Sequence, residues 1–291
     1  MTLYRKARSL AGRIVRSIPW LRRQWLVSAD YTLISEAEAR HRRSGGWLSS
    51  LTVRRQERAY ARLLRDMYAG APRIDLGVAA EAVDAAGLTS ASLLEVGCGS
   101  GYYSEVFTQL PKTKLAYSGT DYSPAMIRRA LERYPSADFA IGDATQLAYG
   151  DHSFDIVFNG VSLMHILDYE KAIAESARIA QIACIFHSVP VFANHPTVYI
   201  HKYAYGSPVV EMVFSRDELL ACFEKNGLSV VRSWNSIPYD VSALVNAPLH
   251  CETFLCDVQG KERAPYKCQF AAKTVTAKPC SDLSARETMS R

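Results

Sequence analysis

The fold of this 291-residue chain is decided at residues 93–101, which read Leu-Leu-Glu-Val-Gly-Cys-Gly-Ser-Gly. An apolar strand runs directly into a glycine-rich turn, and a helical pattern begins near Tyr102. Because glycine has no Cβ, such a turn lets the backbone approach a ligand closely. Its free N–H groups and the following helix N-terminus favour an anionic group. The stretch therefore predicts a ligand site built on a strand, a loop and a helix.

Short apolar segments alternate with helical ones on both sides of this loop. The expected strands are residues 92–96, 115–120, 139–141, 154–159, 183–187, 228–234 and 252–258. The expected helices begin near residues 75, 102, 124, 169 and 216, and Asp75 is the expected cap of the first. Buried strands separated by helices indicate a parallel sheet that is covered on both faces. We therefore expect an α/β fold, a Rossmann-like seven-stranded and mostly parallel sheet with helices on both faces, plus an N-terminal helical extension.

Two carboxylates follow the glycine loop at the ends of later strands. Asp121 ends the second strand, where a carboxylate can accept both ribose hydroxyl protons. Gly142 and Asp143 follow the third strand, at the edge of the sheet where ligands bind in open α/β folds. A dinucleotide-binding loop is disfavoured, because its third glycine would fall at the bulky Tyr102.

Taken together, these motifs resemble class I S-adenosylmethionine-dependent methyltransferases, especially the broad group that includes the ubiquinone and menaquinone biosynthesis enzymes. The resemblance covers about residues 75–258 and rests on residues 95–101, Thr120-Asp121, Gly142-Asp143-Ala144 and residues 154–157. It implies an enzyme that transfers a methyl group from S-adenosylmethionine to an acceptor by direct displacement. Positioning of the acceptor behind the methyl group would supply much of the catalysis.

The resemblance also implies a role for each cofactor-binding residue. Asp121 matches the residue that binds the ribose hydroxyls, and Asp143 the one that binds the adenine amino group. Glu95 matches the acidic start of the loop, which anchors the loop and reaches toward the cofactor's amino group. The implied cofactor-binding set is Glu95, Gly97, Gly99, Gly101, Asp121, Asp143, Ala144 and Asn159.

Two histidines are candidates for a catalytic base. His165 follows the fourth strand and His187 ends the fifth, so both are expected at the active edge of the sheet. An imidazole titrates usefully near neutral pH. His187 is preferred because it lies at the base of the aromatic segment 192–205. The alternative for each is a histidine that only bonds a neighbouring backbone, and the family does not always use a base.

The segment 192–205 is expected to be a loop that covers the acceptor. It holds four aromatic residues and two histidines, a composition suited to stacking on a ring or a sugar face. Tyr199, Tyr203 and Tyr205 are the candidate acceptor-binding residues. The alternative is that these aromatics pack the segment onto the sheet. No metal site is expected, because the two histidines lack an evident third ligand.

Charge divides the chain into three predicted parts. Residues 1–74 are predicted to form a basic N-terminal helical extension. The part before Asp30 contains seven Lys and Arg residues and no acidic residue. Residues 75–277 form the methyltransferase domain, and residues 278–291 a polar tail expected to be disordered. Basic residues beside Leu, Ile and Trp suit a membrane surface, and packing over the cleft or against a second subunit is the alternative.

Composition limits the partners and the compartment. A net charge of +5 is mild for this length and disfavours a dedicated nucleic-acid binder. Seven cysteines at irregular spacing indicate reduced thiols in a cytoplasmic protein, with contact at the membrane periphery left open. The predicted partner is a small-molecule or lipid-linked acceptor, whose identity and methylated atom the sequence does not reveal. A non-catalytic S-adenosylmethionine-binding protein and a methyltransferase of macromolecules remain the alternatives.

Overall fold

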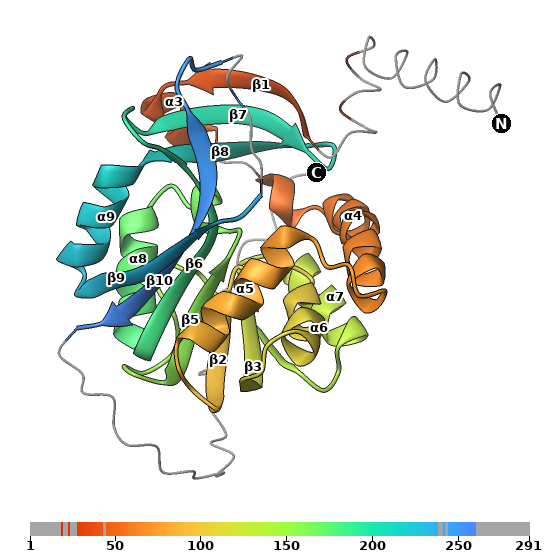
Figure 1. The fold of residues 1–291 in the computed structure, drawn as a ribbon. Helices are drawn as coiled ribbons and strands as arrows, with labels where there is room; N and C mark the ends of the chain where they lie inside the picture. The colour runs from red at the N-terminus through yellow and green to blue at the C-terminus, as the bar shows by residue number, and fades with distance from the viewer. Residues whose placement is uncertain are drawn as a thin grey trace.

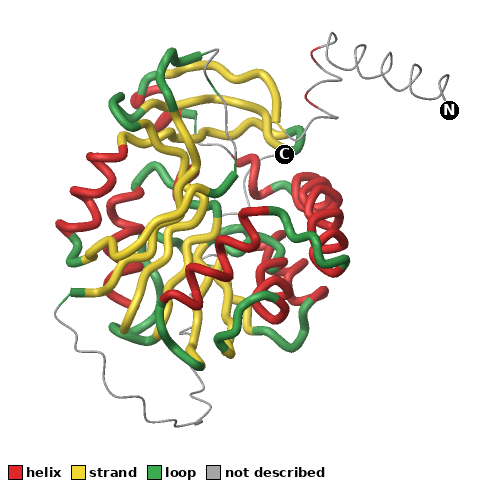
Figure 2. The backbone as a smooth tube through the Cα atoms, viewed as in Figure 1, coloured by secondary structure: helices red, strands yellow, loops and turns green. Residues whose placement is uncertain are grey.

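The computed structural model describes residues 19, 23, 28–42, 45–237, 241 and 244–259. Most of the basic arm before residue 28 and the whole tail 278–291 lie outside the described residues. The predictions of a membrane-binding arm and of a disordered tail therefore stay predictions. Figures 1 and 2 show one central sheet with helices on both sides.

Seven strands of the described chain form the central sheet, in the order β4-β3-β2-β5-β6-β10-β9. Their bounds are β2 (Ser90–Val96), β3 (Lys114–Asp121), β4 (Asp138–Ile141), β5 (Phe154–Gly160), β6 (Ala180–Phe192), β9 (Leu228–Asn235) and β10 (Leu249–Val258). All neighbours from β4 to β6 are parallel, and β10 runs antiparallel to both β6 and β9. The predicted Rossmann-like, mostly parallel sheet is confirmed, with all seven strands where the sequence places them.

Alternating side chains explain why helices cover both faces of this sheet. Along β2, Leu93 packs with α4 (Ser50–Tyr68), α5 (Ile74–Ala85) and α6 (Tyr102–Gln109) on one face. Its neighbour Leu94 packs with α8 (Tyr169–Ile179) and α9 (Arg216–Lys225) on the other. Both leucines are fully buried. Successive residues of a strand point to opposite faces, so a strand buried on both sides is apolar throughout.

Three further strands form an antiparallel layer that the sequence did not reveal. They are β1 (Ser28–Ile34), β7 (Val198–Ala204) and β8 (Ser207–Ser215), paired in the order β1-β7-β8. The layer joins the main sheet where Val191 and Phe192 at the end of β6 pair with β8. The described sheet thus has ten strands rather than seven. Two predictions are wrong here. Half of segment 192–205 is strand β7 rather than a covering loop, and residues 31–34 belong to strand β1 rather than to a helix.

Helices before residue 74 pack directly on the central domain. They are α3 (Glu36–His41), η1 (Gly45–Leu48) and α4, and α7 (Pro124–Arg133) lies beside α4. Tyr60 of α4 shares a buried hydrogen bond of 2.6 Å with Ser100 of the glycine loop. The predicted boundary at residue 74 stays a prediction, but α4 is part of the wall around the glycine loop.

Several properties of the described residues bear on partners. No helix among them is long and apolar enough to cross a membrane. The five cysteines they include are free and buried. No group of three or more His, Cys, Asp or Glu side chains among them has the arrangement of a metal site.

Candidate active site

A cavity of about 670 Å³ opens at the carboxyl ends of the parallel strands. It lies where β2 and β5 are neighbours and their following connections run to opposite sides, the place where open α/β sheets bind ligands. The glycine loop after β2, the ends of β3, β5 and β6, helix α4 and the antiparallel layer all line it. Its volume is within the range of about 300–1,000 Å³ that small-molecule sites occupy.

The three glycines of the loop have positive φ angles for different reasons. A Cβ at Gly97 would lie 2.3 Å from Cβ of Ser162, and one at Gly101 would lie 2.6 Å from the Phe139 ring. These two glycines are required by packing within the protein. A Cβ at Gly99 would meet nothing closer than Gln56, at 3.5 Å. Gly99 therefore faces open cavity, whereas Gly101 does not line the cavity at all.

Replacing Gly99 by Ala or Val tests whether a ligand occupies the cavity beside this glycine, because the added carbons would not clash with the protein itself. Both variants carry the cost of a positive φ of 56°, roughly 1–2 kcal/mol. We expect Gly99→Val to weaken S-adenosylmethionine binding more than Gly99→Ala, since each added carbon fills cavity. Gly101→Ala is the matched control, because Gly101 does not line the cavity, and it should lower the melting temperature through its clash with the Phe139 ring. Equal affinities for the two Gly99 variants in calorimetry would show that Gly99 does not approach the ligand.

Asp121 both holds the glycine loop and lines the cavity. Its two carboxylate oxygens accept backbone N–H groups from Gly99 at 2.9 Å and from Ser123 at 2.8 Å. Only 9% of the residue is exposed. Burial raises the pKa of Asp121 to about 6, and the two backbone bonds oppose that rise. Each oxygen keeps further acceptor capacity, so the carboxylate can still receive hydroxyl protons from a ligand.

Glu95 lies on the floor of the same cavity, one strand position before the loop. It is 1% exposed, and the Tyr117 hydroxyl donates to its Oε2. Burial raises the pKa of Glu95 to about 8, and the hydrogen bond from Tyr117 opposes that rise. The neighbouring Gly160 leaves room for this side chain, because a Cβ there would lie 2.5 Å from Oε1 of Glu95. Glu95 is thus protonated at neutral pH until a cation comes beside it.

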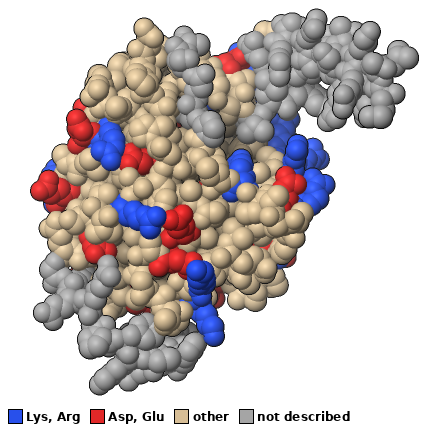
Figure 3. Space-filling view, viewed as in Figure 1, with Lys and Arg blue, Asp and Glu red and all other residues tan. Residues whose placement is uncertain are grey.

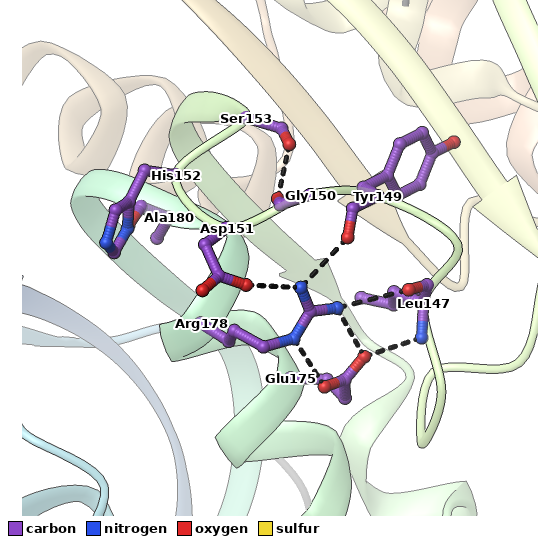
Figure 4. A network of polar contacts seen from close by, with 9 residues as sticks. All are labelled: Leu147, Tyr149, Gly150, Asp151, His152, Ser153, Glu175, Arg178 and Ala180. Atoms are coloured by element: carbon purple, nitrogen blue, oxygen red, sulfur yellow. Dashed lines mark hydrogen bonds and ion pairs between the residues drawn. The ribbon is translucent and has the colours of Figure 1, made fainter. Parts of the chain in front are cut away.

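Asp143 and Ala144 lie on the connection between β4 and β5, and both line the cavity. Asp143 is exposed and accepts from the backbone N–H and the hydroxyl of Thr145, both at 2.8 Å. Arg178 of α8 ties down the rest of this connection (Figure 4). Its guanidinium donates to the Leu147 and Tyr149 carbonyls at 3.1 and 2.9 Å.

The carboxylates around Arg178 complete this anchor (Figure 4). Glu175 accepts from Arg178 at 2.7 and 2.8 Å and from the Leu147 backbone N–H at 2.7 Å. The Arg178 guanidinium lowers the pKa of Glu175, so the pair stays charged at neutral pH. Asp151 gives Arg178 a second carboxylate at 2.8 Å. These bonds hold the backbone of the β4–β5 connection, which carries Asp143, against helix α8.

Asn159 does not line the cavity. Its side chain points into α8, where its amide donates to the Ser176 hydroxyl at 3.1 Å, and only 1% of the residue is exposed. The next residues do reach the cavity: Gly160, Val161 and Ser162 all line it. The resemblance therefore predicted the correct segment at the end of β5, but the residues that reach the cavity begin at Gly160, one position after Asn159.

His187, the preferred base, lies behind the cavity wall. Its Nδ1 is 2.9 Å from the Thr253 hydroxyl and its Nε2 is 3.2 Å from the Ser188 hydroxyl. The ring stacks on Phe158 and meets the edge of Tyr103. Burial lowers the pKa of His187 to about 4. Both nitrogens are engaged and the residue is 1% exposed, so the arrangement is that of a neutral core histidine.

His165, by contrast, lines the cavity. Its Nδ1 lies 2.9 Å from the Val210 carbonyl, which can only accept, so Nδ1 carries the proton and Nε2 has the free electron pair. Nε2 lies 3.8 Å from a carboxylate oxygen of Glu211. Burial lowers the pKa of His165, whereas Glu211 acts to raise it. This geometry gives a neutral imidazole whose protonated form a nearby carboxylate would stabilise.

The antiparallel layer supplies a buried ion pair beside His165. Lys202 of β7 contacts Glu211 of β8, both line the cavity, and they are 6% and 4% exposed. A second pair lies nearby: Arg73 donates to Asp75 at 2.6 and 2.5 Å. Asp75 is therefore not the helix cap that the sequence predicted, because α5 has Arg73 at that position.

The three tyrosines are separated by the strand that carries them. Tyr205 follows β7, lines the cavity and meets the edge of Trp47. Tyr199 and Tyr203 alternate with Lys202 and Ala204 along β7, so they lie on the other side of the layer. Tyr203 is stacked there under the Arg23 guanidinium at 4.3 Å. Only Tyr205 thus lies where the sequence placed all three.

Gln56 of α4 is a cavity residue that sequence reasoning missed. Its Oε1 is buried and accepts no hydrogen bond within the described part of the chain. A buried acceptor without a donor costs about 1–3 kcal/mol unless a ligand supplies the donor. This atom lies beside Gly99 and so fits a ligand seated on the glycine loop. The sequence offered one indication of this role. Gln56 lies four residues before Tyr60 and therefore on the same face of helix α4, the face that packs on the glycine loop.

Strained backbone is concentrated at the cavity. Val161, which follows β5, and Ser188, which lies within β6, both have φ of 53° and both line the cavity. Positive φ is a true outlier for a β-branched residue such as valine. The Val161 backbone N–H donates to the His187 carbonyl, so the residue after β5 is tied to the neighbouring strand β6. Strain that surrounding structure maintains is typical of ligand-binding positions.

Part of this chain is similar in sequence to known methyltransferases. Residues 94–185 match the family model described as a methyltransferase domain. The chain is 31% identical over 133 residues to a demethylmenaquinone methyltransferase of Renibacterium salmoninarum, which covers 44% of this chain and 55% of that protein. It is 25% identical over 167 residues to the demethylmenaquinone methyltransferase of Bacillus licheniformis, which covers 49% of this chain and 72% of that protein. The chain thus spans about half the length of the first of these relatives.

Among solved structures, the chain is similar to a magnesium protoporphyrin IX methyltransferase from Synechocystis with bound S-adenosylmethionine. The identity is 15%, the TM-score is 0.49, and the match covers 77% of this chain and 97% of that one. At this level the likeness carries no functional information.

The glycine loop, the strand order and the family match define the class of this domain. Residues 94–185 are the core of a class I S-adenosylmethionine-dependent methyltransferase domain, as the sequence resemblance predicted. S-adenosylmethionine is accordingly the cofactor of the domain. Glu95, Gly97, Gly99, Asp121, Asp143 and Ala144 line one cavity and fit such a ligand, and Gln56 adds a buried acceptor to it.

Proposed function

We propose that this protein transfers a methyl group from S-adenosylmethionine to a small ring-shaped acceptor. The observation that carries the proposal is the continuity of the cavity. The same cavity is lined by Gly99, Asp121 and Asp143 and also by His165 and Glu211. Both reactants can therefore be enclosed together, and their alignment would supply much of the rate.

The cofactor side would be held by groups already arranged for it. S-adenosylmethionine, when bound, supplies an electrophilic methyl group on a sulfonium. Asp121 would accept hydrogen bonds from the ribose hydroxyls of the cofactor. Gly99 would let the cofactor come close to the backbone of the loop, and Asp143 would accept a hydrogen bond from the adenine amino group. Glu95 would face the ammonium group and give up its proton to do so. Helix α4 would exclude water from above through Gln56 and Tyr60.

The acceptor side would be held by the antiparallel layer and η1. Trp47 and Tyr205 offer aromatic surface to a ring, and the Lys202–Glu211 pair offers charge to its substituents. His165 would accept the proton of a hydroxyl or amine nucleophile at Nε2, and Glu211 would stabilise the imidazolium. The relatives named for demethylmenaquinone act on a ring compound, which supports the same class of acceptor.

Two measurements test this function in sequence. Calorimetry with S-adenosylmethionine and with NAD should show binding of the first alone. Release of S-adenosylhomocysteine should then appear with hydroxylated ring compounds such as hydroquinones and catechols, and should be absent with RNA or protein acceptors. Binding without release from any acceptor would favour a non-catalytic cofactor-binding protein, and release with macromolecules alone would overturn the small-molecule proposal.

Protonation of Glu95 should couple cofactor binding to pH. The free protein holds Glu95 protonated up to about pH 8, and the cofactor's ammonium favours the ionised form. Binding should therefore release a proton, and affinity should rise from pH 6 to 8. Calorimetry in buffers of different ionisation enthalpy measures that proton directly. Glu95→Gln should abolish the release, and an unchanged proton count in this variant would assign the effect elsewhere.

A further inference from the structure

A second groove, of about 560 Å³, runs between α4 and α7 on the outside of the domain. Five arginines and two glutamates line it, which leaves a formal charge of +3. The charged residues are Arg54, Glu57, Arg58, Arg128, Arg129, Glu132 and Arg133. Figure 3 shows Lys and Arg side chains gathered over α4 at the right of the view.

The two glutamates do not neutralise the whole groove. Arg129 donates to Glu57 at 2.7 Å and to Glu132 at 2.8 Å, and Arg133 lies 3.6 Å from Glu57. The glutamates thus bind the inner arginines. Within the described part of the chain, Arg54, Arg58 and Arg128 form no ion pair, and all three are exposed. These three cations therefore face solvent at the groove.

Large apolar side chains are exposed beside these cations. Leu48 of η1, Leu51 of α4 and Tyr122 before α7 are 48%, 50% and 45% exposed. They belong to one place, because the Ser123 hydroxyl donates to the Trp47 carbonyl at 2.9 Å and thereby joins η1 to the start of α7. Tyr122 and Trp47 also line the large cavity, so this place is its rim.

We propose that this face, the three arginines with Leu48, Leu51 and Tyr122, docks on an anionic lipid surface. Arginines attract lipid phosphates, while leucine and tyrosine side chains insert among the acyl chains just below them. A nucleic acid would use the charge but would leave the two leucines in water. The face differs from the basic arm before residue 28, which lies almost wholly outside the described residues.

The position of the face connects it to the reaction. The inference rests on the proposed function, because it assigns the acceptor to compounds that partition into a bilayer. Docking at the rim would place the cavity opening against the membrane, so an apolar ring compound could enter without crossing water. The face would therefore select the acceptor by where it resides as well as by its shape.

Sedimentation of the full-length protein with vesicles tests the docking alone. Vesicles of phosphatidylcholine with 30% phosphatidylglycerol, roughly the anionic content that recruits basic surfaces, should bind it, and pure phosphatidylcholine should not. Arg54→Gln/Arg58→Gln/Arg128→Gln should weaken binding roughly 100-fold, and Leu48→Ser/Leu51→Ser roughly tenfold. The control Lys112→Gln/Lys114→Gln/Lys225→Gln removes the same charge from other exposed positions and should change binding less than twofold.

The outcomes separate this inference from the methyl transfer itself. If the arginine variant and the leucine variant both bound anionic vesicles as tightly as the wild-type protein, the proposed docking face would be wrong. Equal loss in the lysine control, or binding of single-stranded RNA that the arginine variant loses and the leucine variant keeps, would overturn it as well. S-adenosylmethionine affinity should be unchanged in the arginine variant. Failure of cofactor binding in the wild-type protein would instead contradict the proposed function.

Discussion

His165→Asn should lower kcat by about 10²- to 10⁴-fold, the usual contribution of a positioned general base. Asparagine can still donate to the Val210 carbonyl, so the local fold should persist, but it has no basic nitrogen to receive a proton. Cofactor affinity should be unchanged, because His165 lies on the acceptor side of the cavity. Steady-state kinetics with a saturating acceptor measures the effect.

The pH profile distinguishes this role from a structural one. His165 must be neutral to act, so the wild-type rate should fall as pH drops below its lowered pKa and should be level above it. The His165→Asn variant should lose this acidic limb. His187→Asn is the matched control: it should reduce thermal stability, since its ring is packed in the core, and keep the limb. Wild-type kinetics in His165→Asn would remove the base assignment.

Asp121→Ala should weaken S-adenosylmethionine binding by at least about 100-fold. The change removes two charge-assisted bonds to a ligand, each worth about 1.5–3 kcal/mol, and also releases the Gly99 and Ser123 backbone N–H groups. Asp121→Asn keeps one acceptor oxygen and should fall between the alanine variant and wild type. Isothermal titration provides the affinities, and circular dichroism checks that the fold is kept.

A smaller effect is expected from the outer carboxylate. Asp143 is exposed, so Asp143→Ala should cost less than Asp121→Ala. If the two variants lost equal affinity, the buried and the exposed carboxylate would not have the separate roles proposed here. Normal affinity in Asp121→Ala would reject the ribose assignment altogether.

The cofactor half of the site was predictable because its signals are local. Short stretches of sequence are enough to recognise a glycine-rich loop, a carboxylate at the end of a strand, and an apolar strand that is buried on both faces. Glu95, Gly99, Asp121 and Asp143 were placed correctly at one cavity on that basis. Whether they act as assigned remains a prediction until binding is measured.

The acceptor half was not predictable, because it depends on pairing between distant segments. The aromatic-rich composition of segment 192–205 suggested a covering loop, yet its residues alternate across the strand β7. That alternation turns Lys202 toward the cavity and Tyr203 away from it. Glu211 reaches His165 only because β8 pairs beside β7 and contacts η2 (Leu163–His165). No short window of sequence contains these contacts.

The first strand also has a consequence for how the chain is made. Ser28 of β1 pairs with Ala204 of β7, which lies 176 residues further along the chain (204 − 28), so β1 must wait for that length to be made before its partner exists. At a synthesis rate of about 5–20 residues per second, that wait is roughly 10–30 s. The central strands β2 to β6 can assemble meanwhile, as their partners follow closely in the chain. The antiparallel layer that lines the acceptor side is therefore expected to form after strands β2 to β6, when the glycine loop is already in place, and of the described strands only β9 and β10 follow it in the chain.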